Sequence, residues 1–219
     1  MCLILIAYRA HPEYPLVIAA NRDEAFARPA APAQFWEDHP AVYAGRDLEQ
    51  RGTWLGIALN ARFAAVTNFR REGPKKPAPR SRGELASSYL TGTQDPRMYL
   101  NEVRERAGQY NGFSVLVGDM RALYFLSNHG NGVQRVPPGV HGLSNHLLNE
   151  PWPKVTRGVA ALRSGLDSEE SGLASRLFEL LADRTPAADD RPARNAAHPR
   201  RDRELSTFIL GEQYGTRAS

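Results

Sequence analysis

Short apolar runs separated by turn-forming residues recur along the chain and predict a fold rich in strands. The first run, Cys2–Tyr8, contains β-branched residues and predicts a buried strand at the start of the sequence. The second run, Leu16–Ala20, leads directly into the polar cluster Asn21-Arg22-Asp23-Glu24. Two later pairs of runs are separated by hairpin-sized gaps. The predicted strands are Cys2–Tyr8, Leu16–Ala20, Trp54–Leu59, Phe63–Thr67, Phe113–Val117, Ala122–Leu126, His141–Asn145 and Leu205–Leu210.

Helix signals lie between these strands. Ser81 and Glu84 match a capping box, and Asp95 before Pro96 predicts another helix start because Asp caps helices and Pro suits the first turn. Residues 73–79 and 185–203 have loop-like compositions, and we expect the second of these segments to be mobile. The order of strands, helices and strands predicts a single α+β domain over residues 1–219. The predicted helices run from Ser81 to about Leu90, from Asp95 onward, from Pro153 to about Arg163, and through Leu173, Leu177, Leu180 and Leu181.

Composition indicates an ordinary globular protein. The 219 residues are 42% hydrophobic and 24% charged, and a chain of this length buries a full core without disulfides. The longest apolar run, Cys2–Tyr8, is far shorter than the ~20 residues of a membrane span. No basic segment precedes it, so it does not resemble a secretory signal. We therefore expect a soluble, cytoplasmic protein without a membrane span.

Charge and metal-ligand patterns argue against two further classes of protein. The 28 basic and 24 acidic residues give a net charge of only +4, and the basic residues are spread along the chain instead of forming a stripe, so we expect no nucleic-acid partner. The lone cysteine excludes multi-cysteine metal sites and intramolecular disulfides. The six histidines show no HExxH spacing, so we expect no metal site.

The position of Cys2 suggests a catalytic role. If Met1 is removed, as is expected before a small residue, the thiol and the free α-amine belong to the same residue. The amine titrates near ~7.7–8.0 and a thiol near ~8.5, so the amine can serve as a built-in base for the nucleophile. The alternative is that Cys2 is simply a small buried hydrophobic residue.

The polar cluster after the second run gives this site its first supporting residues. If the first two strands pair, Arg22 and Asp23 lie beside Cys2, where an acid can orient the ammonium group and an arginine can favour the thiolate. The alternative is a salt-bridged turn without a catalytic role.

The later part of the sequence contains three further candidate residues. Asn68 and Asn145 each end a predicted strand, where they are either turn formers or donors to a developing oxyanion. Arg217 is either a clamp for a carboxylate or phosphate or simply one of the 25 arginines.

Several short motifs occur along the chain in a characteristic order. They are Met1-Cys2, Ala19–Glu24 with Arg28-Pro29, Gly52–Gly56, Ala65–Asn68, Ser81–Glu84, Tyr110–Phe113, Gly142–Asn145 with Pro151-Trp152, and Tyr214–Arg217. In these motifs the sequence resembles the NRDE family, also called the transport and Golgi organisation protein 2 family, over essentially the whole chain. The resemblance implies a fold like that of the N-terminal-nucleophile hydrolases, an α+β, four-layer αββα sandwich of two antiparallel sheets. We expect the chain to lack the last strand, which relatives have after the final motif.

The resemblance also implies roles for the candidate residues, by comparison with the choloylglycine hydrolase and penicillin V acylase group. Cys2 matches the nucleophile of that group and Asp23 the acid that holds the amine. Asn68 and Asn145 match its two asparagines, and Arg217 its late arginine. The early arginine of those acylases falls on Ala20, so Arg22 is shifted from the matching position.

Two functions are compatible with this resemblance. One is hydrolysis of a non-peptide C–N amide or a thioester, which requires no cofactor. The other is a non-enzymatic carrier of haem or of an acyl-CoA-like lipid, since family members are linked to haem trafficking and lipid homeostasis. The sequence lacks a CxxCH motif, so haem would be held without a covalent bond, by Cys2, a His or a Tyr. A fold retained as an inactive scaffold is the third possibility.

Overall fold

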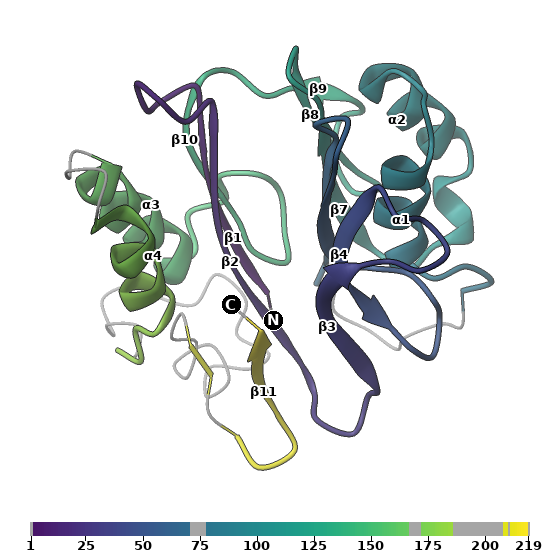
Figure 1. Cartoon of the computed structure of the whole chain (residues 1–219). Coiled ribbons are helices and arrows are strands. Elements are labelled where there is room, and N and C mark those ends of the chain that lie inside the picture. The colour runs from purple at the N-terminus through teal and green to yellow at the C-terminus, as the bar shows by residue number, and fades with distance from the viewer. Residues whose placement is uncertain (1, 71–77, 167–171, 186–207, 210, 219) are drawn as a thin grey trace. The chain divides into compact units, whose positions relative to one another are not determined.

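The computed structural model describes residues 2–70, 78–166, 172–185, 208–209 and 211–218. In this part of the chain the strands form two antiparallel sheets (Figure 1). Each sheet belongs to one of two compact units, which are described separately. The N-terminal unit takes its residues from Met1–Ala27, Pro138–Ser144 and Asn149–Ser219, and the central unit from Arg28–Pro137 and Asn145–Leu148.

The sheet of the N-terminal unit has the strand order β10-β1-β2-β11. Its central strands are the first two apolar runs of the sequence, paired from Leu3 opposite Asn21 to Tyr8 opposite Leu16. Helices α3 and α4 pack against β1, β10 and β2. Alternate strand residues such as Leu3 and Leu5 face these helices and form a core with Leu162. The elements are β1 (Leu3–Tyr8), β2 (Leu16–Ala25), β10 (Gly139–Leu143), α3 (Pro153–Leu166), α4 (Leu173–Leu181) and β11 (Tyr214–Ala218).

The sheet of the central unit has the strand order β3-β4-β5-β6-β7-β8-β9. Helix α1 packs against β5, β6 and β7, and α2 against β7 and β8. Their core includes the fully buried Tyr89 and Phe113. The elements are β3 (Ala30–Phe35), β4 (Val42–Asp47), β5 (Leu55–Ala58), β6 (Phe63–Asn68), α1 (Gly83–Thr91), α2 (Pro96–Glu105), the short 3₁₀ helix Ala107–Gln109, β7 (Phe113–Gly118), β8 (Leu123–Ser127) and β9 (Gln134–Arg135).

These elements confirm the predicted α+β class with two antiparallel sheets. Both predicted hairpins are present, as β5–β6 and β7–β8. The Asp95 cap is also confirmed, since its carboxylate accepts hydrogen bonds from the backbone nitrogens of Arg97 and Met98. None of the helices in the described residues is long and apolar enough to cross a membrane. The assignment of all 219 residues to a single domain stays a prediction.

Several details differ from the prediction. The capping box is wrong, because α1 is preceded by Arg82 without a side-chain cap, and Ser81 contributes its backbone carbonyl instead of its hydroxyl. The polar cluster does not follow β2 but belongs to the C-terminal part of this strand, because β11 pairs with the cluster. Of the predicted strand 205–210, Phe208 and Ile209 are described and lie outside any strand, and the rest falls outside the described residues. The predicted loops at 73–79 and 185–203 also fall mostly outside them.

In the central unit the backbone at Gly52, a glycine of the Gly52–Gly56 motif, lies very close to the backbone of Gly83. A Cβ at Gly52 would lie 2.5 Å from the backbone carbonyl carbon of Gly83, the first residue of α1. We therefore expect Gly52→Ala to lower the free energy of unfolding by about 2 kcal/mol or more, because backbone must move. Urea denaturation measures this loss. Gly108→Ala is the matched control, because nothing lies within 4 Å of a Cβ there; equal losses in the two variants would contradict the explanation.

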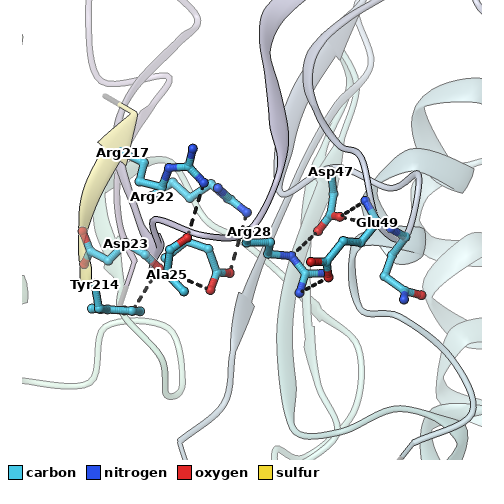
Figure 2. A network of polar contacts seen from close by, with 10 residues as sticks. Arg22, Asp23, Ala25, Arg28, Asp47, Glu49, Tyr214 and Arg217 are labelled. Carbon is cyan, nitrogen blue, oxygen red and sulfur yellow. Dashed lines mark hydrogen bonds and ion pairs between the residues drawn. The ribbon is translucent and has the colours of Figure 1, made fainter. Parts of the chain in front are cut away.

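A partly buried ion pair between Arg28 and Asp47 in the central unit predicts a pH dependence. The Asp47 carboxylate accepts a hydrogen bond from Arg28 Nε at 2.7 Å and further bonds from the backbone nitrogens of Glu49 and Gln50 (Figure 2). Although burial opposes the change, the Arg28 guanidinium holds the pKa of Asp47 below its ordinary value. A depressed pKa in the folded state stabilises the protein above the unfolded value of about 3.9, and this contribution disappears as the pH falls through the folded value.

We therefore expect Asp47→Asn to cost about 1–2 kcal/mol of unfolding free energy at pH 7 and much less near pH 3. Chemical denaturation of both proteins at a series of pH values measures the difference. A difference that grows toward acidic pH would contradict the assignment, because the sign would then be reversed.

Candidate active site around Cys2

The backbone of Cys2 is held at the end of β1. Its neighbour Leu3 pairs with Asn21 of β2, and the next residue, Ile4, pairs with Leu143 of β10. The hydroxyl of Ser144, just beyond β10, donates a hydrogen bond to the Cys2 carbonyl oxygen at 3.0 Å. Cys2 therefore directly precedes β1, the strand that pairs with β2 on one side and with β10 on the other. Its side chain is half-buried.

The backbone and the charge of Asp23, on the neighbouring strand β2, both affect the pKa of the Cys2 thiol. Burial raises the pKa of the Cys2 thiol above its ordinary value, and the negative charge of Asp23 adds to the rise. The thiol is therefore protonated at neutral pH, and its use as a nucleophile requires a nearby base and a stabilising positive charge.

Asp23 is held by β11, and Figure 2 shows Tyr214 of this strand beside it. Asp23 is only 4% exposed and pairs with Thr216, whose hydroxyl donates a hydrogen bond to Asp23 Oδ1 at 2.6 Å. The same hydroxyl accepts a bond from the backbone nitrogen of Ile209 at 2.9 Å, so its proton is directed at the carboxylate. The Tyr214 hydroxyl donates to the Asp23 carbonyl oxygen at 2.9 Å. Both ends of Asp23 are thus held in place.

Arg22 and Arg217 are also on the β2–β11 pair (Figure 2). Arg22 is 9% exposed and forms an ion pair with Glu24, with 3.6 Å between nitrogen and oxygen. Arg217 is exposed and donates to the Ala25 carbonyl oxygen at 3.3 Å. The strand register shifts between Thr216 and Ala218, so Arg217 occupies a β-bulge, a feature that redirects side chains. Within the N-terminal unit, the structure therefore brings Cys2, Arg22, Asp23 and Arg217 to the same region of one sheet.

The two candidate asparagines lie together in the central unit. Asn68 is the last residue of β6, as predicted, whereas Asn145 does not end a strand but lies two residues beyond β10. The side-chain nitrogen Nδ2 of Asn145 donates a hydrogen bond to the backbone carbonyl oxygen of Asn68 at 3.0 Å. The backbone carbonyl oxygen of Asn145 accepts a hydrogen bond from the backbone nitrogen of Arg70 at 2.7 Å. Asn145 has a φ of +53°, which Asn tolerates better than most residues. The Asn68 side chain is exposed. The role of both amides as oxyanion donors stays a prediction.

Three residues of the N-terminal unit that bear on this site were not predicted from the sequence. Thr216 and Tyr214 belong to the motif that contains Arg217, but their contacts with Asp23 depend on the register of β11. Lys154 is 3% exposed, and its charge acts on the Cys2 thiol. An isolated lysine ordinarily indicates an exposed position, so nothing in the sequence pattern marked it. Within the described residues, no group of three or more His, Cys, Asp and Glu side chains is placed to hold a metal ion.

Comparison with known proteins gives a consistent result. The sequence profile of the family described as Transport and Golgi organisation 2 matches residues 1–219. The Transport and Golgi organization protein 2 homolog of Bos taurus is 34% identical, in an alignment that covers all of this chain and 87% of the relative. The Mus musculus homolog is 31% identical with the same coverage. The Drosophila melanogaster protein is 29% identical over 83% of this chain and 72% of its own length.

A solved structure has a similar fold. The Caenorhabditis elegans ortholog of N-acylethanolamine-hydrolyzing acid amidase matches with a TM-score of 0.53, covering 83% of this chain and 86% of that one. The sequence identity is 9%, so the similarity concerns the fold alone. It confirms the predicted N-terminal-nucleophile hydrolase-like architecture.

Proposed function

The chain belongs to the Transport and Golgi organisation 2 family, and from that premise we propose that its N-terminal unit contains a hydrolytic site of the N-terminal-nucleophile type. The observation that supports this most directly is the position of Cys2 directly before β1, which pairs with β2, the strand that contains Asp23. The Asp23 carboxylate is buried and oriented by Thr216. Removal of Met1 places a free amine on Cys2, where a fixed carboxylate can orient it.

The proposed reaction is hydrolysis of a non-peptide C–N amide or of a thioester. The α-amine of Cys2 takes the thiol proton, and the thiolate attacks the substrate carbonyl carbon and forms a C–S bond. The C–N or C–S bond to the leaving group then breaks, and the α-ammonium returns the proton to the departing amine or thiol. Water, activated by the same amine, hydrolyses the acyl-enzyme and releases a carboxylic acid and free Cys2.

The remaining candidates have supporting roles in this proposal. Asp23 orients the α-ammonium group of the processed chain. Arg22 contributes positive charge near the thiol, and the exposed Arg217 is suited to an anionic group of the substrate. Asn68 and Asn145 are the proposed oxyanion donors, because an amide N–H can stabilise the charge that develops on the carbonyl oxygen.

A substrate panel tests the proposal. The mature protein is incubated with fatty N-acyl amides, which the fold shared with an amidase makes the first choice, and with acyl thioesters. We expect release of the free acid from at least one class, with a dependence on Cys2. Absence of hydrolysis by protein shown to lack Met1 and to have a free thiol would contradict an enzymatic role.

The carrier alternative gives a different result. A carrier of haem would show a saturable Soret shift on titration with haemin, abolished by Cys2→Ala or by substitution of a His or Tyr ligand. An acyl-CoA carrier would bind the thioester and return it unhydrolysed. Either result, together with an inactive panel, would replace the hydrolase proposal.

A further inference from the structure

Three rings contact one another in the central unit, next to the two candidate asparagines. Phe69 directly follows Asn68 and stacks on the imidazoles of His129 and His146. Its ring centroid is 4.4 Å from the centroid of each imidazole, at interplanar angles of 30° and 32°. His146 in turn directly follows Asn145. This ring cluster therefore joins the segment after one asparagine to the segment after the other.

The backbone of Asn145 has a conformation that its surroundings must hold. Its φ of +53° lies in the left-handed region, which is unfavourable for a residue with a side chain and persists only where several contacts fix it. Its backbone carbonyl oxygen accepts a hydrogen bond from the Arg70 nitrogen at 2.7 Å, and its Nδ2 donates to the Asn68 carbonyl oxygen at 3.0 Å. The contact between the rings of Phe69 and His146 is a third link between the same two segments.

The ring cluster is itself anchored at β7. The backbone nitrogen of Phe69 donates a hydrogen bond to the carbonyl oxygen of Gly112, the residue before this strand, at 2.8 Å. A Cβ at Gly112 would lie 3.1 Å from His129 Nε2 and 3.2 Å from Phe69 Cβ, so both side chains pack directly against this glycine. The Ser114 hydroxyl of β7 donates to the carbonyl oxygen of His146 at 2.6 Å. The cluster thus fixes both asparagine segments to the same strand.

Strand pairing alone does not fix the two side-chain amides. β6 ends at Asn68, whose side chain is exposed, and Asn145 lies outside any strand. An amide N–H stabilises a developing oxyanion best when its position is set before the reaction. Contacts of the residues that follow the asparagines must therefore supply the rigidity, and Phe69 is the residue that contacts both imidazoles.

From these contacts we propose that Phe69 is a positioning residue, which holds Asn68 and Asn145 in the arrangement that binds the oxyanion. The proposal rests on the proposed function for its catalytic meaning, because the two amides act as donors only in that reaction. The link between the two segments is a separate property, because it can be measured without a substrate.

Hydrogen exchange of the Arg70 backbone amide, followed by NMR, measures this link. The amide donates to the Asn145 carbonyl oxygen, so its protection reports that the two segments are joined. We expect Phe69→Leu to raise its exchange rate about tenfold, and Phe69→Tyr, which keeps the ring, to leave the rate within about twofold. Amides of β7, which is paired with β6 and β8, should keep their rates in both variants.

An unchanged Arg70 rate in Phe69→Leu would overturn the proposal. Equal acceleration at Arg70 and throughout β7 would also overturn it, because the ring would then stabilise the unit as a whole and not the link. If Phe69→Leu does not fold, Phe69→Met takes its place and is judged in the same way.

Turnover of the best panel substrate tests the catalytic meaning. Oxyanion donors act in the transition state, so kcat of Phe69→Leu should fall about tenfold or more while KM stays within about twofold. Phe69→Tyr should retain kcat within about threefold, because it keeps the stacked ring. Phe63→Leu is the matched control, since it makes the same change at the buried first residue of β6. We expect this control to lower stability and to leave kcat unchanged.

The failure of this proposal differs from the failure of the proposed function. Wild-type protein without hydrolytic activity contradicts the proposed function. An active wild type with the same kcat in Phe69→Leu, or with equal losses in the Leu and Tyr variants, contradicts the role of Phe69 alone.

Discussion

Replacing Cys2 with alanine is expected to abolish covalent acylation and to lower hydrolysis by at least about 1,000-fold, because the nucleophile is removed. The change should leave the fold intact, since β1 begins at Leu3 and its strand pairing does not use the thiol. The measurement is the rate of hydrolysis of the best panel substrate, with thermal unfolding as a check of folding. Alanine is also small, so removal of Met1 remains expected.

Two further proteins separate the thiol from the amine. Cys2→Ser keeps a nucleophilic oxygen and a small second residue, so it should be processed but much slower than the wild type. Wild-type protein produced in a host whose methionine aminopeptidase is inhibited retains Met1. The Cys2 thiol is then present, but the free α-amine belongs to Met1. We expect this protein to be inactive. Full activity in Cys2→Ala or in the Met1-retaining protein would show that the mechanism is wrong.

Asp23→Asn is expected to have the second largest effect, a loss of hydrolysis of about 100-fold or more, because the α-ammonium loses the charge that orients it. Asparagine has nearly the same shape, and its carbonyl oxygen can still accept the hydrogen bond from Thr216. The charge of Asp23 raises the pKa of the Cys2 thiol. Removal of this charge should therefore move the midpoint of the pH profile for alkylation of Cys2 by iodoacetamide toward lower pH. The thiolate would thus become more abundant while turnover falls.

This opposite response distinguishes an orienting role from general damage to the site. Asp183→Asn is the matched control, because Asp183 is a carboxylate of the same unit whose partners are Thr185 and Arg157. We expect unchanged hydrolysis in the control. If turnover and thiolate abundance fall together in Asp23→Asn, the carboxylate supports the structure of the site and does not orient the amine.

Much of the N-terminal unit could be predicted from sequence because strong apolar runs fix strand pairing. Cys2–Tyr8 and Leu16–Ala20 each bury a face, and a one-residue slip of their register would move every side chain to the other face. The position of Asp23 beside Cys2 follows from that register. The polar cluster was expected to leave the sheet, and it stays because β11, nearly 200 residues later, pairs with it.

The strands β3 and β4 could not be predicted in the same way. Ala30–Phe35 contains Pro32 and has mostly exposed side chains, and Val42–Asp47 ends in Gly, Arg and Asp. Neither has a strong strand propensity, and each forms a strand because β4 pairs with the well-predicted β5. Tertiary pairing thus decides the structure where local preference is weak.

The supporting residues of the site could not be predicted from the sequence for a related reason. The Thr216 hydroxyl acquires its role from one hydrogen bond to Asp23, which has no periodic signature. Lys154 would ordinarily be assigned to the exposed face of α3, whereas packing against β1 and β10 buries it. Single contacts between distant segments create such roles, and they become visible only when the strand register is known.

Intact-mass analysis of the protein after reaction with an acyl p-nitrophenyl ester tests the central claim most directly. The proposed mechanism predicts a protein that lacks Met1 and gains one acyl group, with peptide mapping that places this group on the Cys2 sulfur. An acyl group on another residue, or equal acylation of protein that still has Met1, would contradict it.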